Sequence, residues 1–215
     1  MKQTFILATT LLTTLLIFTA CGENELYGQQ ADTSEKTPLS LGGTAPMMDY
    51  KMENIDGQMI SLKDVKKENG TLVIFTCNTC PWVVAWEDRY NHVSNIAANN
   101  NIGVIFVNSN ERQREGVDSL KAMKSHAKKM NYNFPYTVDT NHQLADAFHA
   151  QKTPDVFLFN GSNKLVYKGA IDDNAREPKN VEETYLEDAL NELGSGKAIT
   201  NSSTKSLGCS IKRLG

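Results

Sequence analysis

Two elements of regular structure meet in the sequence Thr71-Leu72-Val73-Ile74-Phe75-Thr76-Cys77-Asn78-Thr79-Cys80-Pro81-Trp82. Its unbroken apolar run at 72–75 is typical of a central β-strand that is covered on both faces. After the cysteines, apolar residues recur at three- and four-residue steps, which predicts a helix over about residues 80–98. Pro81 falls in the first turn of this helix, where its missing N–H costs nothing. The two cysteines therefore lie where the predicted strand ends and the predicted helix begins.

This position favours thiol chemistry at Cys77 and Cys80. The start of a helix directs free N–H groups and the positive end of its dipole at the first sulfur, which favours the reactive thiolate. The intervening Asn78-Thr79 carries no charge, so the helix end alone is expected to lower the pKa of Cys77. We expect Cys77 to attack a disulfide and Cys80 to resolve the mixed disulfide. The alternative is a structural bridge, but one that closes so short a loop restricts the unfolded chain little.

The other apolar patterns predict strands that alternate with helices. Asp56-Gly57, between two short stretches that contain apolar residues, predicts a β-hairpin near the start of the domain. Strands are predicted at 71–75, 102–107, 134–138, 155–159 and 164–168, and helices at 80–98, 117–130, 141–150 and 181–193. This order predicts an α/β fold of three layers, in which a central sheet lies between helices.

Residues 1–20 have the pattern of a secretory leader. Lys2 precedes an apolar run at 5–18, and the small residues Thr19-Ala20 come directly before Cys21. This arrangement resembles a bacterial lipoprotein signal, which implies export to the cell envelope and a lipid anchor on Cys21. A plain leader with an incidental cysteine is the alternative. The chain is divided here into the leader at 1–20, a flexible polar tether at 21–44, a folded domain at 45–199 and a tail at 200–215.

Composition narrows the classes of partner. The formal net charge of −3 offers no basic surface for phosphate, so nucleic acid is not an expected partner. Four cysteines are few for a disulfide-stapled fold, which leaves them as candidates for chemistry. None of the four histidines has a cysteine at zinc spacing, so no metal site is expected. No cofactor is expected beyond a redox-active disulfide between Cys77 and Cys80.

Two motifs resemble the thioredoxin fold: Cys77-x-x-Cys80 after a buried strand, and Thr153-Pro154 directly before a later strand. Gly43-x-Ala45-Pro46, the hairpin and the piece that contains Phe134-Pro135-Tyr136 narrow the resemblance to the redoxin branch, which peroxiredoxin-like and periplasmic thiol-disulfide proteins share. The resemblance implies a thioredoxin-like fold with a mixed central sheet, an N-terminal hairpin and an inserted helix–strand unit.

Further segments resemble a group of bacterial thioredoxin-like redoxins. They are Cys77–Pro81, Thr153–Asp155, Gly169–Asn174 and the tail sequence Gly208-Cys209-Ser210-Ile211-Lys212. The group commonly has a cysteine before Thr-Pro-Asp, where this chain has Lys152, so the chemistry of a third cysteine within that loop is absent.

The resemblance also implies roles around the cysteines. The Thr153-Pro154 loop, with a cis bond, is expected to face Cys77 and to offer the Thr153 backbone to an extended substrate by strand addition. Trp82 is expected at the rim of the substrate groove. The expected partners are a disulfide-containing protein or small thiol substrate and a membrane or periplasmic thiol that donates electrons.

Two interpretations of the role of Cys209 remain open. It lies in a polar tail near Lys205, Lys212 and Arg213, whose charges favour a thiolate. It is either a second resolving cysteine that meets the Cys77/Cys80 site or an inert tail cysteine.

Three functions are compared. The first is an exported thiol-disulfide oxidoreductase that uses Cys77 and Cys80. The second is a thiol peroxidase, with Cys209 as a possible resolving cysteine. Peroxiredoxins have a threonine three residues before the reactive cysteine, and here Cys77 or Ile74 stands at that position, which counts against this option. The third is a copper carrier, but copper carriers on this fold usually have three residues between their cysteines, not two.

Overall fold

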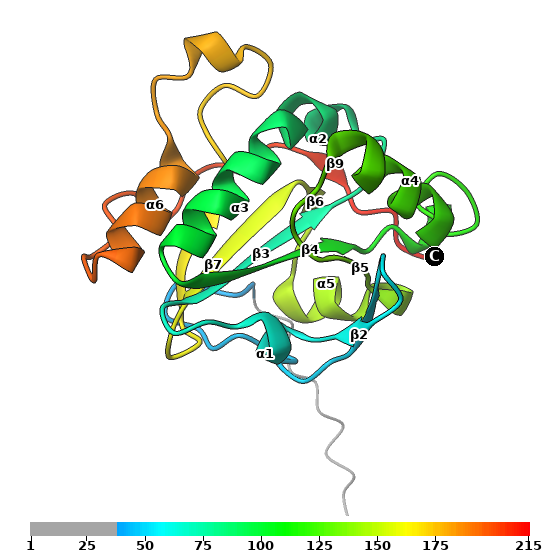
Figure 1. Ribbon diagram of the computed structural model, residues 1–215, viewed down its shortest axis with the longest axis horizontal. Coiled ribbons are helices and arrows are strands. Elements are labelled where there is room, and N and C mark those ends of the chain that lie inside the picture. Colours follow the sequence, from blue (N-terminus) through cyan, green and yellow to red (C-terminus); the bar gives the residue numbers. More distant parts are fainter. Residues whose placement is uncertain (1–37) are drawn as a thin grey trace, which may run out of the picture. The chain divides into compact units, whose positions relative to one another are not determined.

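The computed structural model describes residues 38–215, and its centre is a mixed β-sheet of seven strands (Figure 1). The strands are β1 Met52–Asn54, β2 Met59–Ile60, β3 Gly70–Thr76, β4 Ile102–Asn108, β5 Tyr136–Val138, β7 Asp155–Asn160 and β8 Leu165–Gly169. They lie in the order β2-β1-β5-β4-β3-β7-β8. The central β5, β4 and β3 are parallel, and the pairs on either side are antiparallel. The α/β class and the mixed sheet expected from the sequence are confirmed.

Helices cover both faces of this sheet. Their bounds are α1 Leu62–Val65, α2 Pro81–Trp86, α3 Tyr90–Asn99, α4 Leu120–Met130, α5 Gln143–Phe148 and α6 Tyr185–Gly194, with short 3₁₀ turns η1 Glu87–Arg89, η2 Glu111–Gln113, η3 Thr140–His142 and η4 Pro178–Asn180. Along β3, Leu72 and Ile74 pack in one core with α2, α3, α4 and α6, whereas Val73 and Phe75 pack in a second core with α1 and α5. Successive strand residues face opposite sides. The unbroken apolar run therefore contributes side chains to both cores, and the fold has three layers: helices, the sheet and helices.

The hairpin predicted around Asp56-Gly57 forms between β1 and β2. Gly57 has φ of +90°, a left-handed conformation that glycine adopts without strain. The inserted helix–strand unit is also present, because α4 leads into β5, which joins the sheet between β1 and β4.

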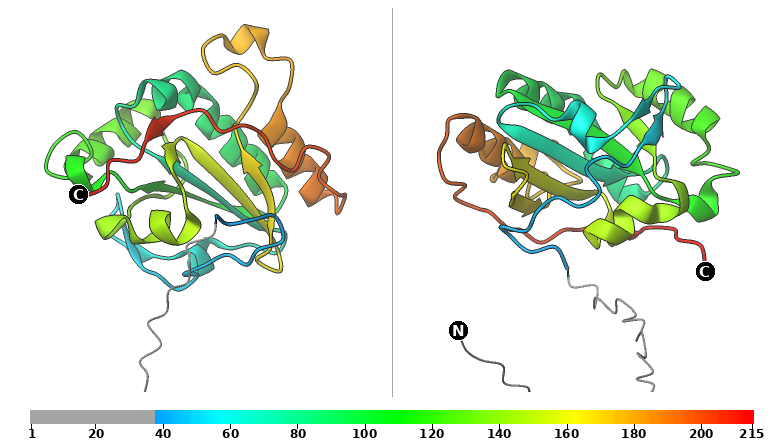
Figure 2. Two further views of the ribbon diagram at one scale, coloured as in Figure 1. Left: turned by 180° about the vertical axis from the view of Figure 1, so that it is seen from behind. Right: turned by 90° about the horizontal axis from the view of Figure 1, so that it is seen from below.

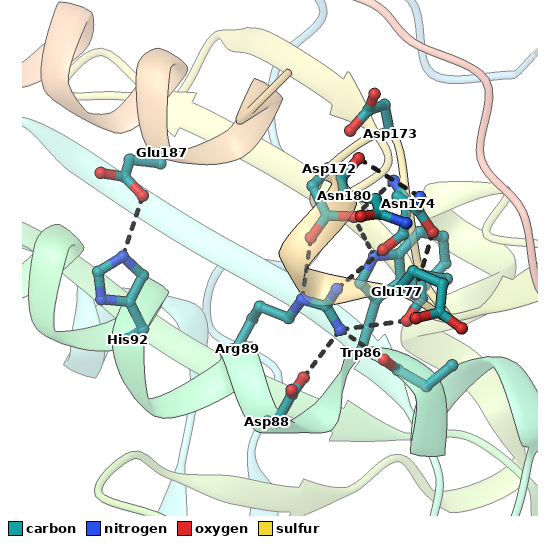
Figure 3. Close-up of polar contacts among 12 residues, drawn as sticks. Trp86, Asp88, Arg89, His92, Asp172, Asp173, Asn174, Glu177, Asn180 and Glu187 are labelled. Carbon is teal, nitrogen blue, oxygen red and sulfur yellow. Dashed lines mark hydrogen bonds and ion pairs between the residues drawn. The ribbon is translucent and has the colours of Figure 1, made fainter. Parts of the chain in front are cut away.

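The long helix predicted at 80–98 is interrupted. The structure has α2, the 3₁₀ turn η1 and then α3 in its place. The Arg89 side chain explains the break, because its guanidinium bonds the Ala85 carbonyl at 2.6 Å, four residues back in the helical ladder. The same guanidinium pairs with Asp172 at 3.0 Å, and the Asp172 carboxylate accepts a bond from the Trp86 indole at 2.7 Å (Figure 3). Asp172, which is distant in sequence, thus holds the Arg89 and Trp86 side chains at the end of α2.

The folded domain begins before residue 45, which corrects the predicted boundary between tether and domain. Gly42 and Gly43 exchange backbone hydrogen bonds with Leu165 of β8, each 2.8 Å long, and Thr44 bridges to Lys164. The predicted leader at 1–20, the lipidation site Cys21 and most of the tether lie outside the described residues. Within residues 38–215, no helix is both long and apolar enough to span a bilayer.

The C-terminal tail is part of the folded domain rather than a free polar end. It runs past β8, where Ser203 bridges to Lys168, and then across the end of the sheet (Figure 2). There it forms β9 (Cys209–Ser210), which pairs antiparallel with β6 (Lys152–Thr153) in a second, two-stranded sheet. The predicted division at residue 200 therefore separates two parts that pack together.

Candidate thiol site

The two cysteines of the CxxC motif lie between β3 and α2, as their sequence position requires. β3 ends at Thr76, and Cys80 is the N-cap residue of α2, with Pro81 at the first helical position. Both sulfurs are buried, because Cys77 is 2% exposed and Cys80 is 7% exposed. The helix therefore begins immediately after Cys80 and not after Cys77.

The Thr153-Pro154 loop contacts both sulfurs. The peptide bond between these residues is cis. The Thr153 hydroxyl lies 3.4 Å from Cys77 Sγ, and the Thr153 carbonyl lies 3.2 Å from Cys80 Sγ. Thr153 is itself buried, so it is held rigidly against the cysteine pair. The loop thus lies where the resemblance implied.

Cys209 also lies beside the Thr153-Pro154 loop and the CxxC pair. In the β6–β9 pair, Cys209 is directly opposite Thr153. Its thiol interacts with the Cys80 sulfur, and all three of these cysteines are free. The structure thus brings Cys209, which is far away in the sequence, to the CxxC pair.

The two thiols of the CxxC pair titrate together, because each is the largest influence on the pKa of the other. A hydrogen bond from the Cys77 thiol lowers the pKa of Cys80 to about 4, and the Cys209 thiol and the N–H groups of Val83 and Cys209 lower it further. The Cys80 interaction, burial and the nearby Asp118 carboxylate raise the pKa of Cys77. The reduced pair therefore takes on one negative charge readily and resists a second. The assignment of that charge to Cys77 stays a prediction.

One contact opposes a negative charge on Cys80. The Thr153 carbonyl, 3.2 Å from Cys80 Sγ, is an acceptor and repels a thiolate. Four hydrogen-bond donors, namely two thiols and two backbone N–H groups, act in the opposite direction and stabilise the Cys80 thiolate. Because hydrogen bonds to a charged form favour that form, the donors prevail.

A buried polar network supports the Cys77 side of the site. The Asp118 carboxylate accepts bonds of 2.9 Å from the backbone N–H of Asn78 and from the side-chain amides of Asn108 and Asn110. Tyr136 bonds Asn78 and Asn108 at 3.0 Å each. Every one of these side chains is at least nine-tenths buried. The network fixes the turn between the cysteines and adds a fixed negative charge near Cys77.

Sequence reasoning missed this network. Asp118 and Asn108 lie in segments that no motif marks, and only the pairing of β3 with β4 brings Asn108 beside Thr76. The available signal was the polar run Asn108-Ser109-Asn110 at the end of a predicted buried strand. Polar residues at the carboxyl end of a central parallel strand are typical of a site.

Trp82 lies beside the site rather than in its cavity. A cavity of about 190 Å³ is lined by Cys77, Thr79, Cys80, Pro81, Asn110, Gln113, Thr153, Cys209, Ser210 and Lys212. The Trp82 ring instead packs 6.0 Å from Trp86, with the Arg176 guanidinium 5.4 Å above it. The backbone of Trp82 does face the tail, because its N–H favours the thiolate of Cys209. Within residues 38–215, no group of three or more His, Cys, Asp or Glu side chains is arranged to hold a metal ion.

Several known proteins are similar to this chain in sequence or in fold. Over 137 residues, the chain is 27% identical to the thiol-disulfide oxidoreductase ResA of Bacillus subtilis, which covers 61% of this chain and 68% of that protein. A crystal structure of an uncharacterised conserved protein from Geobacillus kaustophilus is 32% identical, with a TM-score of 0.75, covering 82% of this chain and 93% of that one.

A thioredoxin domain of a thiol-disulfide oxidoreductase from Bacteroides vulgatus is 17% identical with a TM-score of 0.51, covering 61% of this chain and 89% of that one, and it shares the fold alone. The family model for redoxins matches residues 41–185, which include the CxxC pair and the cis-proline loop. The chain therefore belongs to the redoxin family and has the thioredoxin-like fold of a thiol-redox protein.

Proposed function

We propose that this redoxin is a thiol-disulfide oxidoreductase in which Cys80 attacks and Cys77 resolves. The observation that carries the proposal is the placement of both buried sulfurs against Thr153 of the cis-proline loop, and the pKa of Cys80 is lowered to about 4. A thiolate at neutral pH is the form that attacks disulfides. A second thiol in contact with it resolves the mixed disulfide.

The reductive reaction balances with these two residues. The Cys80 thiolate attacks one sulfur of a substrate disulfide, an S–S bond forms to Cys80, and the substrate bond breaks. The released thiolate takes a proton from water. Cys77 then loses its proton to water and attacks Cys80 Sγ, which expels the second substrate thiolate. The protein dithiol has lost two electrons and the substrate has gained two, and a thiol reductant of the cell envelope restores the dithiol.

Cys209 has a place in the same scheme as a second resolving thiol. Its sulfur interacts with Cys80, the atom that carries the mixed disulfide. Its pKa is raised, by burial first and then by the Cys80 sulfur, so it stays protonated while Cys80 is charged. It therefore follows Cys80 in the reaction and does not precede it.

The experiment is a single turnover. Reduced protein is mixed with one equivalent of bis(2-hydroxyethyl) disulfide, and the released thiol is measured. We expect full release from the natural protein and background release from Cys80→Ala. The variant with both Cys77→Ala and Cys209→Ala should stop at the mixed disulfide, which intact mass detects. Cys21→Ser is the matched control for loss of a cysteine. Full release from Cys80→Ala overturns the proposal.

A thiol peroxidase is the second candidate, and the thiolate at Cys80 favours it. A hydroperoxide would oxidise Cys80 to a sulfenic acid and leave as an alcohol or water. The Cys209 or Cys77 thiol would then condense with the sulfenic acid, releasing water and forming a disulfide. Rapid consumption of hydrogen peroxide that Cys80→Ala abolishes would support this reading, and slow consumption beside rapid disulfide reduction would exclude it.

We also propose that the protein is exported and held to a membrane by a lipid on Cys21. The leader-like sequence at 1–20 supports this location. Growth of expressing cells with a labelled fatty acid should label the protein, and Cys21→Ser should abolish the label. Label that persists in Cys21→Ser contradicts the anchor.

A further inference from the structure

The tail occupies the backbone edge beside the reactive sulfurs. In the β6–β9 pair, Lys152 lies opposite Ser210, and Thr153 lies opposite Cys209. An open strand edge next to a reactive group is where an extended peptide adds as a further strand. Here the chain's own residues already pair with that edge. A protein substrate that binds in extended form therefore competes with the tail for the same backbone groups.

The tail is tied down on both sides of Cys209. Before it, the Lys152 ammonium donates to the Ser206 carbonyl at 2.8 Å. After it, the Ile211 N–H donates to the Gln151 carbonyl at 3.0 Å, and the Ile211 side chain is buried in the second core. Lys212 also pairs with the loop after β4, through its N–H to Asn110 at 2.8 Å and its carbonyl to the Arg112 N–H at 2.9 Å. The tail is thus held along its length.

The tail also lies closer to β6 than a side chain permits. A Cβ built on Gly208 would lie 2.6 Å from the Thr153 carbonyl oxygen and 2.9 Å from its carbon. Both atoms belong to the backbone, so they cannot rotate away. Any residue larger than glycine at position 208 must shift the tail or the Thr153 backbone, which weakens the pairing of the two.

What remains open at the sulfurs is small. The cavity beside them holds about 190 Å³, and its lining includes Cys209, Ser210 and Lys212 of the tail itself. Pockets for drug-sized ligands begin at roughly 300 Å³. A small molecule fits this space, whereas a peptide segment with its side chains does not.

We propose that the tail at 205–212 makes low-molecular-weight disulfides the substrates of the closed site. Protein disulfides reach Cys80 only when the tail strand leaves β6. This inference rests on the proposed function and specifies its substrate class. The chemistry is the same exchange, in which one small disulfide becomes two thiols while the Cys77–Cys80 dithiol becomes a disulfide.

The test compares two probes in single turnover with the reduced full-length protein: bis(2-hydroxyethyl) disulfide and insulin. Each rate is divided by that of dithiothreitol with the same probe, which removes the intrinsic difference between the disulfides. For the natural protein, we expect the insulin ratio to be at least about tenfold below the small-disulfide ratio, since protein docking at the edge is blocked. Gly208→Ala should close most of this gap by raising the insulin rate. Gly116→Ala is the matched control, since its Cβ would meet only the Gln113 carbonyl, at 3.7 Å.

Ile211→Ala provides a second release of the tail by removing its buried apolar anchor, and hydrogen exchange at 205–212 reports the release in both variants. Equal ratios for the two probes in the natural protein overturn the inference. A gap that persists in a variant with a released tail also overturns it. A protein that reduces neither probe instead refutes the proposed function, so the two failures are distinct.

Discussion

Cys209 lies directly opposite Thr153 in an antiparallel strand pair, and Thr153 contacts both Cys77 and Cys80. One buried threonine therefore stands among all three cysteines of the described chain. Its hydroxyl faces one sulfur, its carbonyl faces a second, and its backbone is paired with the residue that bears the third. A change in the position of the tail therefore changes the surroundings of the Cys77 and Cys80 sulfurs.

The first prediction concerns the charged sulfur. Thiolate absorbance of the reduced protein should rise near pH 4, because the pKa of Cys80 is lowered to about 4. The Cys77 thiol is the largest cause, so Cys77→Ala should raise this pKa by at least about one unit. Cys209→Ala should raise it less. Titration of absorbance at 240 nm measures both shifts, and iodoacetamide labelling near pH 6 should modify Cys80 first. Preferential labelling of Cys77 contradicts the assignment.

The second prediction concerns Asp118. Asp118→Asn removes the carboxylate that helps to raise the pKa of Cys77, so this pKa should fall. It also sets an amide NH₂ against N–H donors, which should lower the free energy of unfolding by about 2–3 kcal/mol. Urea unfolding and thiolate titration measure the two effects. Glu115→Gln, on the same loop and exposed, is the matched loss of charge and should change neither.

The third prediction concerns pH and Asp155, at the start of β7. Burial raises the pKa of Asp155 from 3.8 to about 6, although the N–H of Gln151 and the hydroxyl of Ser206 act against this. Because the folded state holds the proton more tightly, the stability from this group is complete below pH 3.8 and is lost as the pH rises through 6.

Asp155→Asn should therefore gain about 2 kcal/mol relative to the natural protein between pH 4.5 and pH 7.5. Urea unfolding at both pH values measures this difference. Asp88→Asn, which changes an exposed carboxylate, serves as the control. A stability difference between Asp155→Asn and the natural protein that does not change with pH would show that Asp155 titrates normally.

The fourth prediction concerns the pair that breaks the helix. Arg89→Met leaves the buried Asp172 carboxylate without its ion-pair partner, which should cost about 3–5 kcal/mol of stability. Adding Asp172→Asn should recover much of this loss, because no buried charge then remains. Asp88→Asn removes the more exposed partner of the same guanidinium and should cost less than about 1 kcal/mol. Urea unfolding followed by tryptophan fluorescence measures all three, and equal losses in Arg89→Met and Asp88→Asn would contradict the prediction.

Much of the fold follows from local sequence. The apolar run at 72–75, the Asp56-Gly57 turn and the helical spacing after Cys80 each depend on neighbours within one element, so their reading needs no tertiary structure. The break at Arg89 could not be read in this way. Arg89 pairs there with Asp172, which follows β8 and is far away in the sequence.

The candidate site divides along the same line. The strand-to-helix junction identified Cys77 and Cys80 as the candidate thiol pair. The resemblance implied that the Thr153-Pro154 loop faces this pair. The expectation for Cys77 took the helix end as the only influence on its pKa. In the structure each sulfur is the largest influence on the other, and Asp118 beside Cys77 and Cys209 beside Cys80 add to it from distant segments.

The amino-acid sequence by itself determined that two thiols lie at the junction of a buried strand and a helix, because periodicity and spacing act over a few residues. Only the tertiary structure decided which groups surround and cover the two sulfurs. Electrostatic and backbone contacts depend on distance in space. The pairing of the tail with β6 sets those distances at Cys80.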